Sequence, residues 1–257
     1  MLNEPLNPGM GLARTAMVKG RVSPEALAEL DAALAGRRRA PWLLRSEFAP
    51  LARADHNALD RWWDRAVIAG FKETMPAAFA VDELVERYGR RVAYIERSAP
   101  ATIASILARP TFWAWGWPGQ YEVFLDSIYA PAADGTGLEE LWPLVAEART
   151  YVERVALCWA AAHIAVFTSL AKARLPLFDY DALDWPGLCH HLGVVWDPSV
   201  ANIDQRSRTT YGSPIELTKG ELDAIGSFTQ HVDSYKRLAI AASAPTAEPS
   251  RIDPTML

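Results

Sequence analysis

The chain has 257 residues, of which 50% are hydrophobic and 22% charged, an ordinary globular composition with enough length for one large domain. The formal net charge of −5 excludes a protein that is basic overall, but it leaves room for a local basic pocket that binds a small anion rather than nucleic acid. The two cysteines, Cys158 and Cys189, have no metal-ligand spacing and form no disulfide framework, which favours a reducing, cytoplasmic location. The N-terminus lacks the basic start and apolar core of a signal peptide.

The first predicted element is a helix that follows Ser23. Ser23 suits the N-cap, Pro24 suits the first helical position, and Gly36 suits the end of the helix. The apolar stripe of this helix consists of Leu27, Leu30 and Leu34. The run Arg37-Arg38-Arg39 that comes next is interpreted as a solvated turn.

The next segments alternate between strand and helix. Residues 66–71 form a short apolar run, which suits a strand buried on both faces of a parallel sheet. Residues 81–88 predict a helix, and Gly89 suits its C-terminal cap. Residues 91–95 predict a second strand, and a further helix is expected to begin near Pro100. This order predicts an α/β layer with right-handed crossovers.

The most apolar part of the chain, residues 155–170, lies within a region, 138–173, that predicts one long helix or two helices. The apolar stretch is short for a membrane span and contains His163, so a buried helix is predicted and no membrane association is expected. His163 is interpreted as a core residue whose hydrogen bonds are satisfied.

The last elements are a strand and two helices. Residues 175–180 predict the strand, and residues 183–192 predict a helix that Gly193 closes. Thr218 and Glu221 form a capping box, which predicts a helix that runs to about residue 242.

The segment around the second strand carries the clearest chemical signal. The strand delivers Arg97 to its carboxyl end, and a turn then leads into a helix whose second turn carries Ser105. Ligands of open α/β sheets bind at the carboxyl ends of strands, where a planar guanidinium and a hydroxyl suit a phosphate group. The alternative is a structural arginine that pairs with an acid, with a serine that faces the helix groove.

A strand that ends in Arg, a turn that contains Pro, and a Ser in the following helix resemble the motif with which sulfotransferases hold the 3′-phosphate of PAPS (3′-phosphoadenosine-5′-phosphosulfate). The resemblance implies this role for Arg97 and Ser105, and it places Tyr180 near the adenine. It covers nearly the whole chain, because other similar segments follow in the family's order. These are Leu2-Asn3-Glu4-Pro5-Leu6, Phe71-Lys72-Glu73, Leu177-Phe178-Asp179-Tyr180-Asp181-Ala182-Leu183 and Leu192-Gly193-Val194-Val195-Trp196.

The resemblance implies an α/β fold of the P-loop NTPase type, with three layers around a central parallel sheet, over residues 1–242. The tail, 243–257, is expected to be disordered. The family's Gly/Ser/Thr-rich loop for the 5′-phosphosulfate has no counterpart in the sequence, and the resemblance places it, with the central first strand, before Met1. This implies either a truncated reading frame or a natural remnant. The chain as given is therefore expected to lack transferase activity and to be poorly stable.

The resemblance also implies candidate residues for the reaction. Glu4 and Glu73 are alternative general bases for the acceptor's hydroxyl proton, and Lys72 is a candidate for neutralising the sulfuryl group in transfer. Each also has a structural interpretation, as a residue that pairs with a neighbouring charge.

Two further segments are candidates for contacts with the substrates. Arg206 and Arg208 match the position of a basic loop that closes over the 3′-phosphate, although an exposed polar loop is the alternative. The tryptophans of a glycine- and proline-containing segment are expected to line an acceptor pocket or to cover an exposed edge of the core. These are Trp113, Trp115 and Trp117.

The sequence thus indicates a sulfotransferase-like protein that takes PAPS as co-substrate and a hydroxyl or amine compound as acceptor, with no metal. A non-catalytic, sulfotransferase-like protein that binds an adenosine 3′-phosphate is the first alternative. Another nucleotide-binding protein of the P-loop class, such as a small kinase, is the second.

Overall fold

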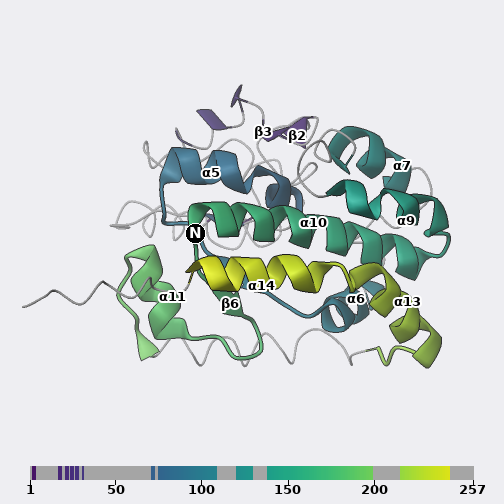
Figure 1. Cartoon of the computed structure of the whole chain (residues 1–257). Coiled ribbons are helices and arrows are strands. Elements are labelled where there is room, and N and C mark those ends of the chain that lie inside the picture. The colour runs from purple at the N-terminus through teal and green to yellow at the C-terminus, as the bar shows by residue number, and fades with distance from the viewer. Residues whose placement is uncertain are drawn as a thin grey trace, which may run out of the picture.

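The computed structural model of the chain describes residues 2–3, 17–18, 21–22, 24–25, 27–28, 31, 71–72, 75–108, 120–129, 138–198 and 215–243. Short strands and longer helices follow one another along these residues (Figure 1). The strands are β1 Leu2–Asn3, β2 Met17–Val18, β3 Arg21–Val22, β4 Phe71–Lys72, β5 Tyr94–Glu96 and β6 Leu177–Asp179. The helices are η1 Met75–Ala80, α5 Val81–Tyr88, α6 Ala99–Leu107, α7 Gln120–Phe124, η4 Leu125–Tyr129, η5 Leu138–Leu141, α9 Trp142–Glu147, α10 Tyr151–Ala173, α11 Trp185–Leu192, α13 Lys219–Thr229 and α14 Val232–Ser243.

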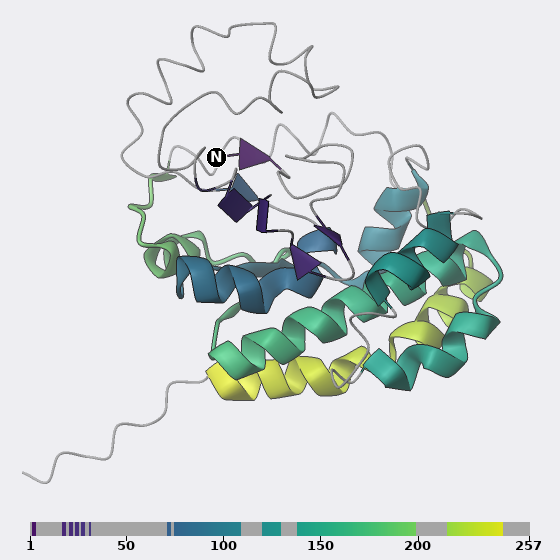
Figure 2. The ribbon, with the colours of Figure 1, turned by 90° about the horizontal axis from the view of Figure 1, so that it is seen from above.

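The helix α10 is the centre of the described core. It begins with a capping box between Thr150 and Glu153, whose backbone hydrogen bond from Thr150 lowers the pKa of the Glu153 carboxyl. It ends at Arg174, which adopts the left-handed conformation with φ 52°. Its side chains from Val155 to Ile164 are all buried. The helix α14 lies alongside α10 in both ribbon views (Figures 1 and 2), and α5, α6 and α13 also pack against it.

Among the described helices, α10 is long enough and apolar enough to cross a membrane, judged by length and composition alone. Its most apolar window is 72% buried inside the protein, because α14, α13 and η1 cover it. Such burial is what a core helix shows, in agreement with the prediction for residues 155–170.

The described strands form three two-stranded sheets. β1 pairs with β4 in parallel, with Leu2 opposite Phe71 and Asn3 opposite Lys72. β2 and β3 pair antiparallel, and β5 pairs with β6 in parallel. Parallel pairing needs a long crossover, and the connection from β5 to β6 includes α6 and α10. The predicted α/β class is confirmed at this level, and the described part of the chain is mostly helical.

Several element boundaries agree with the local signals in the sequence. α5 spans Val81–Tyr88 as predicted, and Gly89 caps it with φ 66°. α6 begins at Ala99, so Pro100 lies in its first turn. The region 138–173 contains separate helices, because the chain breaks the helix between Glu147 and Tyr151.

Three predicted boundaries are corrected. The strand predicted over 91–95 is β5, Tyr94–Glu96, and that over 175–180 is β6, Leu177–Asp179, since three residues of each pair with the other. The predicted helix that starts after Thr218 is divided into α13 and α14 by a turn at Gln230 and His231. This turn allows Phe228 of α13 and Val232 of α14 both to be buried against the core.

The first predicted helix agrees with the residues that the structure describes there. Pro24, Glu25, Leu27, Ala28 and Asp31 are helical. The Asp31 carboxylate accepts hydrogen bonds from the side chains of α5, with 2.7 Å from Arg87 Nε and 2.9 Å from Tyr88 Oη. The hydrogen bond from Arg87 is the main cause that lowers the pKa of Asp31. The predicted turn at residues 37–39 and the tail from residue 244 lie outside the described residues.

Candidate functional site

The carboxyl ends of β5 and β6 bring two predicted site residues together. Glu96 is opposite Asp179 in the parallel register, and the backbone N–H of Tyr180 donates to the Glu96 carbonyl over 2.8 Å. The pairing therefore continues one residue beyond the end of β6. As a result Arg97 and Tyr180 emerge side by side, with Arg97 Cζ 5.2 Å from the centroid of the Tyr180 ring. A cation above an aromatic face at this distance contributes about 0.5–1 kcal/mol.

The guanidinium of Arg97 has a hydrogen-bonding capacity that is not used. Arg97 is half-buried, and its Nε is buried without a hydrogen-bond partner among the described residues. Two other buried side-chain atoms in the described part of the chain share this condition, Trp159 Nε1 and Thr168 Oγ1, but both belong to uncharged side chains of α10. An ionised donor that is removed from water and left unpaired costs more than a neutral one. Arg97 is thus suited to receive an anionic oxygen.

The turn after Arg97 places it at the start of α6. The Arg97 carbonyl accepts a hydrogen bond from Thr102 Oγ1 over 3.3 Å, and the Ser98 carbonyl accepts one from the Thr102 backbone N–H over 2.9 Å. Ser98 is the N-cap of this nine-residue helix, and its side chain makes no capping hydrogen bond. The amino-terminal end of α6 carries partial positive charge, which adds to the charge of Arg97.

The residue before Arg97, Glu96, is a buried acid at the end of β5. Arg97 itself lies one residue beyond the strand, where continued alternation of side chains would direct it away from Glu96. Glu96 is 8% exposed, and its Oε2 lies 2.6 Å from Nζ of Lys236 on α14. Asp179, across the pair, is exposed and accepts the backbone N–H of Asp181 over 2.8 Å. The sequence analysis did not single out Glu96 or Lys236, because they lie far apart in the chain and no local pattern joins them.

Tyr94, two residues before Glu96, contacts His163 of α10, and both ring nitrogens of His163 are hydrogen-bonded. The Trp159 carbonyl accepts from Nδ1 over 2.7 Å, so Nε2 is the acceptor for the Tyr94 hydroxyl at 2.9 Å. The His163 ring also stacks on the indole of Trp159, with a centroid distance of 3.6 Å. Burial lowers the pKa of His163 to about 3, so the ring is neutral. The interpretation of His163 as a satisfied core residue is confirmed.

Of the remaining predicted site residues, the structure describes Ser105 and Lys72. Ser105 is exposed on α6, and its convergence with Arg97 on one phosphate stays a prediction. Lys72 lies in β4 opposite Asn3 of β1. The other candidates lie outside the described residues: Glu4, Glu73, Trp113, Trp115, Trp117, Arg206 and Arg208.

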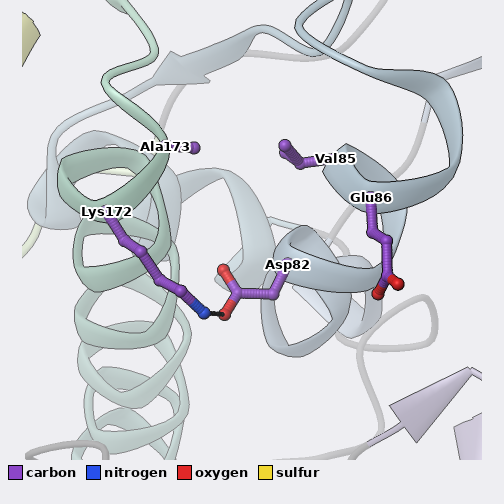
Figure 3. Close-up of a pocket in the computed structure, with 5 residues that line it drawn as sticks. All are labelled: Asp82, Val85, Glu86, Lys172 and Ala173. Carbon is purple, nitrogen blue, oxygen red and sulfur yellow. Dashed lines mark hydrogen bonds and ion pairs between the residues drawn. The ribbon is translucent and has the colours of Figure 1, made fainter.

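A separate open pocket of about 320 Å³ lies between α5 and the carboxyl-terminal end of α10 (Figure 3). Lys172 and Asp82 reach toward each other across it and pair with an Nζ–Oδ2 distance of 2.6 Å, while Glu86 projects on the far side of Asp82. Val85 and Ala173 line the rest of the pocket. Both partners of the ion pair are largely exposed, so the pocket is a shallow hollow whose charges are screened by water.

In the part of the chain that the structure describes, no group of three or more His, Cys, Asp or Glu side chains is arranged to hold a metal ion. The candidate site is the strand-end arrangement of Arg97, Tyr180 and the start of α6, whose cationic and N–H groups suit an anion. Comparison of the sequence with models of known protein families gives no match. Comparisons with curated proteins and with solved structures also give none.

Proposed function

We propose that this chain is a sulfotransferase-like protein and that the carboxyl ends of β5 and β6 bind the 3′-phosphate end of PAPS. The observation that carries the proposal is the half-buried Arg97, which lies over the Tyr180 ring and whose Nε has no partner among the described residues. A phosphate oxygen at Nε would remove an unpaired buried donor, whose cost is about 1–3 kcal/mol. The same contact would place the adenosine near Tyr180, the residue that the resemblance assigns to the adenine.

The proposed fold is a three-layer fold of the P-loop type. Two parallel pairs, β1–β4 and β5–β6, support it, because parallel pairs are the unit from which a central sheet with helices on both faces is built. In the proposed architecture both pairs belong to one sheet, and their carboxyl ends form one edge at which the nucleotide binds.

Where a Gly/Ser/Thr-rich loop for the 5′-phosphosulfate is also present, the proposed reaction is transfer of the sulfuryl group to a small hydroxyl or amine acceptor. The acceptor oxygen or nitrogen forms a bond to sulfur, the bond from sulfur to the 5′-phosphate oxygen breaks, and the acceptor's proton passes to a carboxylate. Glu4 and Glu73 are the proposed alternative bases, and Lys72 is proposed to neutralise charge on the sulfuryl group. The parallel pairing of Asn3 with Lys72 supports this assignment, since Glu4 and Glu73 come next in sequence after these two residues.

Contacts from three other segments complete the proposal. We assign Ser105, Arg206 and Arg208 to the 3′-phosphate, and Trp113, Trp115 and Trp117 to the acceptor pocket. The reaction needs no metal in this scheme, because positioning and charge neutralisation dominate the transfer of such a group. The free thiols of Cys158 and Cys189 support the proposed cytoplasmic location.

Titration calorimetry with adenosine 3′,5′-bisphosphate tests the binding site. We expect binding by the wild-type chain, weaker binding of adenosine 5′-monophosphate, which lacks the 3′-phosphate, and loss of the difference in Arg97→Ala. Arg149→Ala, which removes an exposed arginine just before the start of α10, is the matched control. Equal binding of both nucleotides by the wild type, or unchanged binding by Arg97→Ala, would refute the assignment of Arg97.

Transfer is measured separately, with labelled PAPS and a panel of phenols, alcohols and amines. Binding accompanied by transfer identifies the enzyme, whereas binding without transfer identifies the alternative, a non-catalytic protein that binds the nucleotide. The two outcomes share the strand-end site and differ in the groups that act on the sulfuryl end.

A further inference from the structure

The buried carboxylate of Glu96 precedes the proposed anion site by one residue. A negative charge on the residue next to Arg97 opposes the binding of an anion there by Coulomb repulsion. Glu96 is 8% exposed, so its charge is not dispersed into solvent. Its neighbour across the sheet, Asp179, is a second acid, which increases the local negative charge.

Lys236 offsets this charge from a distant part of the chain. Its Nζ lies 2.6 Å from Oε2 of Glu96, and its side chain is 38% exposed while that of Glu96 is 10% exposed. The helix α14, which carries Lys236, contacts both α10 and β6, so the ammonium group is held against the inner face of the β5–β6 pair. Lys236 pairs with Glu96, whereas Nε of Arg97 has no hydrogen-bond partner among the described residues, so the two cations make separate contacts.

Two titratable side chains that feel the charges of this pair are those of Tyr94 and His163. Burial is the main cause that raises the pKa of Tyr94, and the charge of Glu96 raises it further. His163 is neutral, its pKa being lowered mainly by burial and also by the charge of Lys236. The charges of Glu96 and Lys236 thus extend to neighbouring side chains, and Lys236 is the cation with which Glu96 forms its ion pair.

We propose that Lys236 is a positioning residue of the anion site: it neutralises Glu96 and so leaves the positive charge of Arg97 available to the ligand. The inference rests on the proposed function of Arg97. The competing explanation is that the ion pair only fixes α14 to the sheet. The two explanations differ in sign, because a purely structural pair makes the loss of either partner harmful, whereas an electrostatic role makes the loss of Glu96 favourable to anion binding.

The test compares Lys236→Met, Glu96→Gln, the double variant and the conservative Lys236→Arg by calorimetry with adenosine 3′,5′-bisphosphate at low salt. We expect Lys236→Met to weaken binding about tenfold, as one uncompensated charge near the site does. Glu96→Gln should bind as tightly as the wild type or tighter, while the double variant and Lys236→Arg should remain near the wild type. Raising the salt concentration should reduce the effect of Lys236→Met.

Glu96→Gln decides the question even if Lys236→Met does not fold, because weaker binding by a folded Glu96→Gln overturns the electrostatic role. Unchanged binding by Lys236→Met, in a protein whose binding Arg97→Ala abolishes, overturns the role of Lys236 and leaves the site intact. Absence of binding by the folded wild-type chain overturns both the proposed function and this inference. Thermal melting of each variant identifies the folded ones.

Discussion

His163 and Arg97 both lie next to the β5–β6 pair and show two ways in which a protein treats a polar group removed from water. Both nitrogens of His163 have partners, and the surrounding rings of Trp159 and Phe167 exclude water from it. Arg97 rests on one aromatic ring, and its buried Nε has no partner among the described residues. The satisfied group is part of the core, whereas the unsatisfied, charged group is where a ligand gains most. Mutations around His163 should therefore change mainly the free energy of unfolding, whereas mutations of Arg97 should change mainly the binding of an anion.

The largest expected effect is on the His163 side. Phe167 is fully buried on α10 and packs edge to face against both His163 and Tyr94. Phe167→Ala should lower the free energy of unfolding by about 3–5 kcal/mol, since it leaves a cavity in the centre of the core. Leu238→Ala on α14, where the side chain is 62% exposed, is the control and should change stability by less than about 0.5 kcal/mol. Denaturant unfolding measures both, and similar losses would contradict the location of the core.

Acidic pH should lower the free energy of unfolding through His163. The pKa of His163 is about 3 in the folded protein against an ordinary value of 6.5, so the unfolded state binds the proton more readily. Stability from this group is present above pH 6.5 and is lost as the pH falls from 6.5 toward 3, by up to about 1.4 kcal/mol per pH unit.

The pH dependence is measured by unfolding the wild type and His163→Gln at a series of pH values from 7 to 4. Other acids titrate in both proteins, so the difference between the two slopes reports His163. Identical slopes would show that His163 has the same pKa in the folded and unfolded chains, and the contrast with Arg97 would then disappear.

A smaller effect is expected from the hydrogen bond between Tyr94 and His163. Tyr94→Phe removes the hydroxyl that donates to Nε2 over 2.9 Å and leaves a buried acceptor without a partner. The expected loss of stability is about 1–3 kcal/mol. In a double-mutant cycle with His163→Phe, the two losses should not add, because the double variant removes both partners. Additive losses would show that the hydrogen bond contributes nothing.

The smallest expected effect on stability is on the Arg97 side. Arg97→Met keeps the apolar stem over the Tyr180 ring and removes an unpaired donor, so the free energy of unfolding should change by less than about 1 kcal/mol in either direction. Thermal melting without nucleotide measures this change. A loss as large as that of Phe167→Ala would identify Arg97 as a structural residue and would remove the main support for the strand-end site.

Local signals in the sequence were enough to predict several of the helix ends. α5 begins and ends as predicted, Gly193 closes α11 with φ 71°, and Thr218 forms the expected capping box with Glu221. The location of Arg97 at the end of a strand, directly before a helix, also followed from the sequence. These features depend on residues a few positions apart, where backbone geometry and side-chain hydrogen bonds are decided locally.

The tertiary structure alone decided which distant residues meet. The length of β5 depends on how many residues of β6 pair with it, and the turn between α13 and α14 depends on burial against α10. Likewise Tyr94 meets His163 and Glu96 meets Lys236 because the helices α10 and α14 pack on one face of a parallel pair. The sequence determined the caps and the strand-end arginine, since these are short-range effects. Which acids, rings and cations surround that arginine depends on long-range packing, which no local pattern encodes.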